Sequence, residues 1–305
     1  MMKRIFSALM CLLMLFTALP AMADQPQPIE TIPYEQIPVN ANGQYHYLLL
    51  CMDHWNGGTN GNSDGIVLLT FDTRAPRIML TSLLRDSLVE RPDGKIGRIN
   101  YIAKNYGPEA LCKVISQHIG VKVEKYILFD FNQIQTIIDY MGGVNITVTD
   151  AEADYLNRYR ISRTATTPSM NKAGTYLFGG HAAVIYMRIR KAGGGGDFMR
   201  TQRVRTVLST LADQCREITY DEALALVDNV MANTTLTNMN LDEMVQAMEY
   251  AYELRGCTIE ELRIPQDGDA TPINYASMSV QEIDWVSSRA HMDDFLQNSF
   301  LVLDD

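Results

Sequence analysis

The chain has 305 residues, and 36 acidic against 26 basic side chains give it a formal net charge of −10. This acidic balance argues against a nucleic-acid-binding protein, because such proteins present a basic surface to the phosphates. The length alone does not require more than one domain.

The N-terminus has the three parts of a secretory signal peptide, over residues 1–23. Lys3 and Arg4 form a positive start, an apolar run follows, and Ala21 and Ala23 mark a small-residue cleavage site. Cleavage after Ala23 would remove both cations and take the net charge from −10 to −12. An uncleaved N-terminal anchor is the alternative. In both cases we expect an exported protein, extracellular or associated with the cell wall or the outer face of the membrane.

Four cysteines would remain after cleavage: Cys51, Cys112, Cys215 and Cys257. Disulfides are allowed in an exported protein, and four cysteines permit three pairings. A bond between Cys215 and Cys257 is one expectation, because both flank the same C-terminal helical region. Four reduced cysteines in the core are an equal alternative.

Residues 24–42 are rich in Pro, Gln and Asn and are expected to form an extended leader. A single domain then covers residues 43–305, because no linker rich in Pro, Gly or Ser interrupts them. Its first strand is predicted at residues 45–52, a continuous apolar run typical of a buried strand. Two further strands, at residues 65–72 and 77–84, flank a four-residue turn and predict a hairpin.

The rest of the chain alternates between helical and strand patterns. We expect helices at residues 107–119, 131–141, 201–216, 220–232 and 240–254. We expect strands at residues 125–130, 144–148 and 258–265, a polar mobile loop at 157–173, and an amphipathic helix within 279–303. This alternation predicts an α/β fold with a mixed β-sheet flanked by helices.

The densest basic segment of this acidic chain lies between residues 183 and 207. It holds five arginines, namely Arg188, Arg190, Arg200, Arg203 and Arg205. The apolar residues before Arg188 predict a strand, so Arg188 and Arg190 would share one face. A run of four glycines and then a helix follow, and Arg200 and Arg203 lie one turn apart on that helix. Because guanidinium groups bind phosphate oxygens two at a time, the segment predicts an anion site. A solvated basic patch is the alternative.

Charged residues at the ends of the predicted strands point to the same site. Asp53 ends the first strand and Asp64 begins the second, so one rim of the sheet would hold both carboxylates. Two carboxylates that face arginines suit Mg²⁺, which takes few protein ligands and shares the rest of its shell with phosphate and water. Ordinary turn residues are the alternative. Arg85 and Asp86 follow the third strand and would join the same rim.

Other catalytic patterns find little support in the sequence. His54, His118 and His181 are scattered, and His118, inside a predicted helix, is expected at the surface. His54 could touch the site because it follows Asp53. The glycines at residues 193–196 are not followed by the Lys-Ser/Thr of a phosphate-binding loop, so they indicate a hinge.

The order and spacing of these motifs resemble the LytR–CpsA–Psr family of cell-wall phosphotransferases over roughly residues 47–211. The matching segments are LLLCMD with NSDG, SLLRDS, GRINYIAKNYG, IDYMGGVNITV, and YMRIR with DFMRTQR. The resemblance implies a mixed sheet flanked by helices, with an apolar pocket for a polyprenyl chain. It also implies an enzyme that moves a glycopolymer from a polyprenyl-pyrophosphate carrier onto peptidoglycan, with Mg²⁺ at the pyrophosphate.

The resemblance also implies roles for individual residues. The metal would be held by Asp53 and Asp64. The pyrophosphate would be held by Arg85, Arg98, Arg188, Arg190 and Arg200. The catalytic residues would be Arg85, Asp86, Arg188, Arg190, Arg200 and Arg203. The partners would be the lipid-linked glycopolymer, peptidoglycan and the membrane surface that holds the lipid.

The sequence departs from the family pattern at three places. Cys51 and Met52 replace a strand-end glycine, Asn62 stands where an arginine is usual, and Val204 stands where a glutamine is usual. The last two changes remove polar groups that would face phosphate. They leave open a protein that binds a polyprenyl phosphate or a wall polymer without turnover, and also a pyrophosphate hydrolase that uses water as acceptor.

Overall fold

The computed structural model describes residues 25–39, 43–53, 61–158, 172–190, 192, 196–234 and 236–297. The predicted signal peptide, His54 and most of the polar segment 157–173 lie outside these residues. Among the helices described, none is both long enough and apolar enough to cross a membrane.

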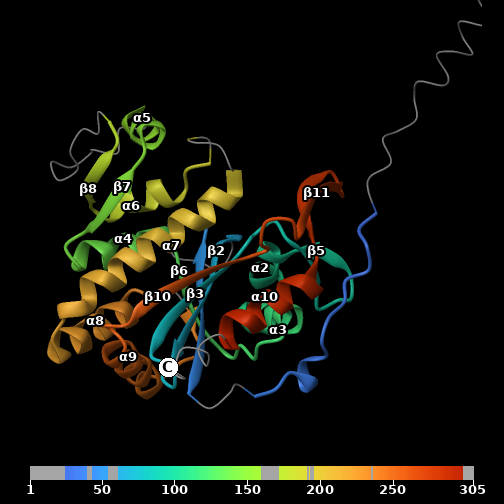
Figure 1. Ribbon diagram of the computed structural model, residues 1–305, viewed down its shortest axis with the longest axis horizontal. Helices are drawn as coiled ribbons and strands as arrows, with labels where there is room; N and C mark the ends of the chain where they lie inside the picture. The colour runs from blue at the N-terminus through green and yellow to red at the C-terminus, as the bar shows by residue number, and fades with distance from the viewer. Residues whose placement is uncertain are drawn as a thin grey trace, which may run out of the picture.

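The centre of the fold is a six-stranded sheet (Figure 1). Across the sheet its strands are β10 (Thr258–Ile264), β3 (Arg77–Leu83), β2 (Ser63–Asp72), β1 (Gln44–Met52), β6 (Lys125–Phe129) and β9 (Leu236–Thr237). β2 runs antiparallel to β1 and to β3, whereas β6 is parallel to β1 and β10 is parallel to β3. The predicted mixed sheet and the predicted hairpin of the second and third strands are therefore confirmed.

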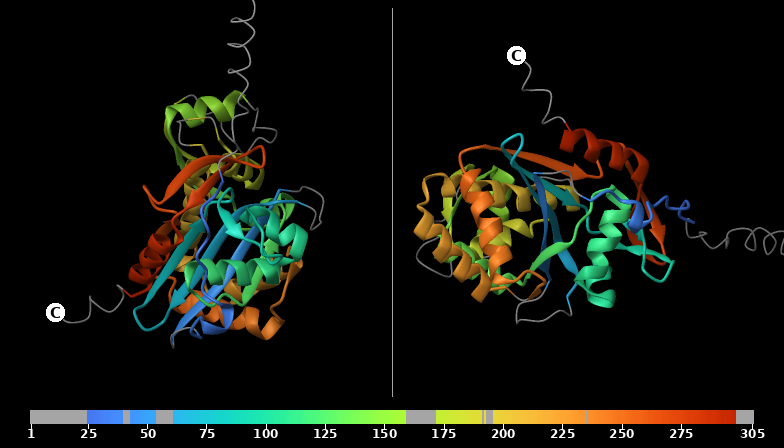
Figure 2. Two further views of the ribbon diagram at one scale, coloured as in Figure 1. Left: turned by 90° about the vertical axis from the view of Figure 1, so that its right-hand side faces the viewer. Right: turned by 90° about the horizontal axis from the view of Figure 1, so that it is seen from below.

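Helices cover both faces of this sheet, so the molecule has three layers (Figure 2). One face packs against α2 (Ile102–Tyr106), α3 (Pro108–Ile119) and α10 (Trp285–Gln297). The other face lies toward α4 (Phe131–Tyr140), α7 (Gly196–Gln214), α8 (Tyr220–Ala232) and α9 (Leu241–Glu253). Alternate side chains of each strand point to opposite faces. On β1, Leu48 and Leu50 join the first core and Tyr47 and Leu49 the second, which explains the continuous apolar run.

A smaller group of elements extends the second face, next to α4 and α7. It consists of β7 (Val144–Val148), α5 (Asp150–Arg158), β8 (Gly174–Phe178) and α6 (Gly180–Met187). β7 and β8 form an antiparallel pair, and this group shares one apolar cluster with α4 and α7. Gly180 allows α6 to lie very close to α4, because a Cβ there would be only 2.1 Å from the carbonyl oxygen of Gln135. This contact fixes the helix that leads to Arg188.

Two small hairpins lie outside the central sheet. They are β4 (Leu88–Glu90) with β5 (Ile96–Arg98), and β11 (Ala270–Tyr275) with β12 (Met278–Ile283). A single β-bridge between Ser87 and Gln281 joins the two hairpins. Within residues 279–303 we expected only a helix, but this segment forms most of strand β12 and then the helix α10.

The expected strand before Arg188 is wrong: these residues form the helix α6. A short apolar run such as AAVIYM fits a buried helix and a buried strand equally well, so its periodicity does not decide between them. Arg188 is the C-terminal cap of α6, and Arg190 lies two residues beyond. The two arginines therefore do not share the face of a strand.

Two further expectations are wrong: the surface position of His118 and the disulfide between Cys215 and Cys257. His118 is 1% exposed instead of lying at the surface, with Nδ1 2.6 Å from the Val114 carbonyl oxygen and Nε2 accepting from the Glu90 amide. Burial lowers the pKa of His118 to about 4, so the imidazole is neutral. Cys51, Cys112, Cys215 and Cys257 are all free, so the expected bond between Cys215 and Cys257 does not form.

Candidate active site

The ends of three neighbouring strands bring charged residues to one rim of the sheet. Asp53 directly follows β1, Asp64 is the second residue of β2, and Arg85 lies two residues beyond β3. Arg85 Nη1 donates to Asp64 Oδ1. The backbone amide of Asp53 donates to the carbonyl oxygen of Asn62, at 2.9 Å, which closes the ends of β1 and β2 against each other. The expectation that these residues share a rim is confirmed.

Two arginines reach this rim from the helices above the sheet. Arg188, at the end of α6, places Nη2 3.2 Å from Asp53 Oδ1, and its guanidinium lies 4.4 Å from the centre of the Phe131 ring. Arg200, in the first turns of α7, places Nη1 3.2 Å from Asp64 Oδ2. Asp64 is thus held between Arg85 and Arg200, one on each carboxylate oxygen. Segments separated by more than a hundred residues therefore converge on one pair of carboxylates.

The Arg200 guanidinium is buried without a hydrogen bond. Its side chain is 3% exposed, and Nε, Nη1 and Nη2 are all shielded from solvent and lack a partner in hydrogen-bond geometry among the described residues. The contacts with Asp64 and Asp197 lie within ion-pair distance only. Burial lowers the pKa of Arg200, although the two aspartates oppose this effect. A buried cation whose three nitrogen atoms make no hydrogen bond is costly, and an anionic ligand would satisfy it.

A second carboxylate pair, Asp86 and Asp197, lies beside the first. Burial and a hydrogen bond to Asp197 raise the pKa of Asp86 to about 6. Burial also raises the pKa of Asp197, but its hydrogen bond with Asp86 and the neighbouring Arg200 and Arg85 hold that pKa below its usual range. Below about pH 6, Asp86 is protonated and donates to the ionised Asp197, so the pair carries about one negative charge. Near neutral pH Asp86 is mostly ionised as well, and the pair carries nearly two negative charges.

This second pair connects the remaining arginines to the site. Arg98 Nη1 donates to Asp86 Oδ1 at 2.9 Å, and its guanidinium stacks 4.3 Å from the centre of the Tyr101 ring. Arg190 Nε lies 3.6 Å from Asp197 Oδ1, and nearly half of the Arg190 side chain is exposed. Asp197 thus pairs with arginines from three segments, because Arg85 and Arg200 also approach it. The sequence analysis assigns Asp197 no role of its own, although its position one turn before Arg200 is a signal that identifies it.

Arg203 lies away from both cavities, whereas a catalytic residue is expected to line one of them. It is 2% exposed and lines neither of the cavities described below. Nε donates to Glu152 Oε1 at 2.7 Å, Nη1 to the Ile189 carbonyl oxygen at 2.8 Å, and Nη2 to the Ala192 carbonyl oxygen at 3.0 Å. These two carbonyls flank Arg190. Arg203 therefore holds the segment that presents Arg188 and Arg190 and ties it to α5.

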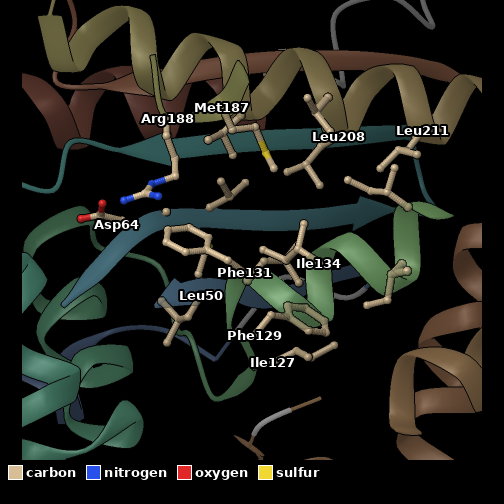
Figure 3. A pocket seen from close by; sticks show the side chains of 18 of the residues that line it. Leu50, Asp64, Ile127, Phe129, Phe131, Ile134, Met187, Arg188, Leu208 and Leu211 are labelled. Atoms are coloured by element: carbon tan, nitrogen blue, oxygen red, sulfur yellow. The ribbon is translucent and has the colours of Figure 1, made fainter. Parts of the chain in front are cut away.

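Two cavities meet at the charged rim. The apolar cavity, of about 290 Å³, lies between the sheet, α4 and α7, and its walls include Leu50, Phe129, Phe131, Ile134, Met187, Leu208 and Leu211 (Figure 3). The polar cavity, of about 550 Å³, is lined by Asp53, Asp64, Tyr155, His181, Ile185, Arg188, Arg190 and Arg200. Asp64, Arg188 and Arg200 line both cavities. These three residues lie between the apolar cavity and the polar cavity, and we call them the partition.

The apolar compartment continues away from the rim. A second apolar cavity, of about 350 Å³, shares several wall residues with the first, among them Leu49, Ile127, Leu208, Leu211 and Val230. It extends toward α8 and α9 and is lined there by Met244 and Met248. Val204, which stands where a glutamine is usual, lines the apolar cavity beside Arg200. The predicted apolar pocket is therefore present, and Val204 extends it up to the partition.

The described residues contain no group of three or more His, Cys, Asp or Glu side chains placed to hold a metal ion. Asp53 and Asp64 nevertheless line one cavity together, and Asp53 is about 40% exposed on its side chain. Two carboxylates fit an ion such as Mg²⁺ only if phosphate and water complete its shell.

The sequence of this chain matches a known protein family. The family model described as the LytR_cpsA_psr family matches residues 18–292. The chain belongs to the LytR–CpsA–Psr family. Among curated members, it is 23% identical over 197 residues to the polyisoprenyl-teichoic acid–peptidoglycan teichoic acid transferase TagV of Bacillus subtilis, covering 63% of this chain and 48% of TagV. It is 24% identical over 240 residues to the transferase TagU of Bacillus licheniformis, covering 78% of this chain and 73% of TagU.

Solved structures of family members share the fold. A structure of the Bacillus subtilis protein TagT (YwtF) with bound octaprenyl pyrophosphate lipid matches with a TM-score of 0.65 at 17% identity, covering 88% of this chain and 96% of TagT. The α/β fold with a mixed sheet flanked by helices is therefore a property of the family. The chain spans about half the length of TagV and about three-quarters of that of TagU.

Proposed function

We propose that this protein is a phosphotransferase that moves a glycopolymer from a polyprenyl-pyrophosphate carrier onto peptidoglycan. The observation that supports this most is the partition, where Arg200, buried and without a hydrogen bond, faces an apolar cavity on one side and a polar cavity on the other. A lipid diphosphate has the same three parts in the same order: an apolar chain, two phosphates and a polar head. The similarity to the transferases TagV and TagU supports the same activity.

The polyprenyl chain would occupy the apolar cavity, so that the diphosphate reaches Arg188 at the end of that cavity (Figure 3). Arg200 lines the same cavity and would bind the diphosphate together with Arg188. These guanidinium groups, with Arg85 and Arg190, would bind the phosphate oxygens in place of the carboxylates that hold them now. Binding of octaprenyl pyrophosphate by TagT, which shares this fold, supports that arrangement. The burial that leaves Arg200 without hydrogen bonds would then strengthen its attraction for the diphosphate.

In the transfer step, a hydroxyl oxygen of peptidoglycan attacks the phosphorus that carries the glycopolymer. A bond forms between that oxygen and the phosphorus, and the bond from the phosphorus to the bridging oxygen breaks, so that polyprenyl phosphate leaves. The arginines neutralise the charge that develops on the leaving group. The hydroxyl proton is released to solvent or to the pair of Asp86 and Asp197. A loose transition state requires little help from a base.

Mg²⁺ is part of the proposal, and Asp53 and Asp64 would hold it together with diphosphate oxygens. When bound, the ion would supply neutralisation of the diphosphate charge. Asp64 would then exchange its ion pairs with Arg85 and Arg200 for the metal, which would release both arginines to phosphate. The reaction would take place outside the cytoplasm at a membrane surface, because the lipid carrier lies there; the signal-peptide pattern of residues 1–23 supports this.

The test uses purified protein, Mg²⁺, a polyprenyl-pyrophosphate glycan and peptidoglycan, with polyprenyl phosphate and wall-linked glycan measured separately. The proposal predicts release of polyprenyl phosphate that depends on peptidoglycan and yields wall-linked glycan. Release at the same rate without peptidoglycan would identify a hydrolase instead. Tight binding of the lipid without release would identify a binding protein, as the changes at Asn62 and Val204 leave open.

A further inference from the structure

The polar cavity has a wall that the arginines and aspartates do not account for. Beyond the charged rim, this wall is formed by Tyr155 of α5 and by His181 and Ile185 of α6. All three side chains are partly exposed, and Tyr155 and Ile185 also pack against the apolar cluster that α5, α6 and α7 share. The wall is therefore built on two helices, and it faces the same space as Arg188 and Arg190.

Helix geometry aligns this wall with the partition. His181, Ile185 and Arg188 are spaced four and three residues apart, so they lie along one face of α6 and its C-terminal cap. At 1.5 Å per residue, the seven positions from His181 to Arg188 span roughly 10 Å. The face thus leads from the phosphate-binding end into the polar cavity over about the length of one or two sugar rings.

The position of α5 relative to this face is fixed by buried contacts. Glu152, one turn before Tyr155, is buried and accepts a hydrogen bond from Arg203. The other oxygen of Glu152 accepts from the amide and hydroxyl of Thr149, just before α5. Since Arg203 also holds the segment with Arg188 and Arg190, one buried arginine sets the spacing between Tyr155 and the phosphate-binding arginines.

The partition decides what this wall contacts. If the lipid chain lies in the apolar cavity and the diphosphate at Arg188 and Arg200, the group on the second phosphate must enter the polar cavity. We propose that Tyr155, His181 and Ile185 form a subsite for the first sugar of the donor. The inference rests on the proposed function and adds the residues that would distinguish a sugar-bearing lipid diphosphate from a bare one.

The chemistry of the wall suits a sugar. A tyrosine ring and an isoleucine side chain offer apolar surface to the C–H faces of a pyranose, while the tyrosine hydroxyl and the imidazole nitrogens can bond its hydroxyl edge. The two carboxylates that line the cavity, Asp53 and Asp64, are paired with Arg188 and Arg200. A second anionic group would be drawn to the arginines, whereas a neutral, hydroxyl-rich ring matches the helix wall.

The experiment measures binding of two probes in the presence of Mg²⁺: a short-chain polyprenyl pyrophosphate, and the same lipid with one N-acetylhexosamine on its terminal phosphate. We expect Tyr155→Ala and His181→Ala each to weaken binding of the sugar-bearing lipid about tenfold, since each removes one contact surface or hydrogen bond. Binding of the bare lipid should change less than twofold. Tyr155→Phe, which keeps the ring, should retain most of the affinity and guards against misfolding of the alanine variant.

Matched controls are Tyr106→Ala and His291→Ala, which remove a tyrosine and a histidine that do not line the cavity. Both should bind the two lipids like the wild type. Equal weakening for both lipids in the Tyr155 and His181 variants, or none for either, would overturn the subsite. A raised KM for peptidoglycan with donor binding intact would also overturn it, because the wall would then serve the acceptor. A wild-type protein that binds neither lipid would refute the proposed function itself.

Discussion

The two faces of the central sheet are built from similar strand residues but differ in what covers them. On the face toward α3 and α10, Leu48 and Leu68 are fully buried and the core is filled. On the face toward α4 and α7, Leu49 is only partly buried and lines two cavities. We call these the closed face and the open face. The strands place apolar side chains on both faces of the sheet, so the helices that cover each face determine which one contains cavities.

The helix α7 shows how the open face is kept open. Of its five buried residues, three are arginines: Arg200, Arg203 and Arg205. The corresponding helix of the closed face, α3, buries Leu111, Ile115 and other apolar side chains instead. Buried guanidinium groups need partners and do not fill space as leucines do. The closed face therefore supplies packing, and the open face supplies a ligand site.

The largest effect that would test this division is expected at Arg200. Arg200→Met should lower kcat/KM for glycopolymer transfer about 10³-fold, because it removes a preorganised cation from the diphosphate. The free energy of unfolding should stay unchanged or rise, because a buried cation without hydrogen bonds contributes little stability. Transfer kinetics and urea denaturation of the same preparation measure both quantities.

The control is Arg205→Met on the same helix. Arg205 donates to Glu261 and to Ser82, so it fastens α7 to β10 and β3. Its replacement should cost about 2 kcal/mol of stability, less than for a fully buried pair because Glu261 reaches solvent, and should change transfer by the folded protein only a few fold. If the two variants lose stability and activity to the same extent, Arg200 and Arg205 do not have separate roles in ligand binding and in structure.

The next effect compares a leucine on each face. Leu111→Ala, in the filled core, should lower the free energy of unfolding by about 3 kcal/mol, whereas Leu208→Ala, beside an existing cavity, should cost about 1 kcal/mol. Leu208→Trp should fill the cavity without loss of stability and weaken binding of a polyprenyl pyrophosphate at least tenfold. Equal costs for the two alanine variants would show that the open face is packed like the closed one in solution.

The residue pattern was sufficient to predict the rim, whereas the cavity was predicted only through the resemblance to the family. Asp53, Asp64 and Arg85 were predictable because each lies at the end of a strand, and paired strands bring their ends together. The roles of Arg188 and Arg203 were less accessible. Arg188 follows a helix whose apolar run also fits a strand, and the partner of Arg203, Glu152, lies 51 residues away in the chain. Leu208 lines a cavity, but the sequence around it has the same apolar periodicity as the sequence around a core residue. Cavity and core therefore cannot be distinguished until the positions of the helices are known.

Acid should weaken the closed face specifically. His118 and His46 are buried there, and burial lowers the pKa of each to about 4 from an ordinary value of 6.5. The unfolded chain then binds more protons below pH 6.5, so stability is present above that pH and is lost as the pH falls toward 4. Each histidine should remove about 2 kcal/mol at pH 5 relative to pH 7.5. Urea titrations at both pH values measure the loss, and in His118→Phe it should shrink by about half; an unchanged loss in that variant would place the acid sensitivity elsewhere.

The smallest effect is expected at Asp53, which lines the polar cavity beside the partition. Its side chain is partly exposed and pairs with one arginine, whereas Asp64 is buried between two, so a substitution of Asp53 disturbs the site least. Asp53→Asn should raise the Mg²⁺ concentration that half-saturates binding of a polyprenyl pyrophosphate about tenfold, because one of two carboxylate ligands becomes neutral. Asp154→Asn, on the exposed side of α5, is the matched control and should leave the titration unchanged. If Asp53→Asn also leaves it unchanged, the ion binds away from this rim, and Asp53 serves only to hold Arg188 until the diphosphate arrives.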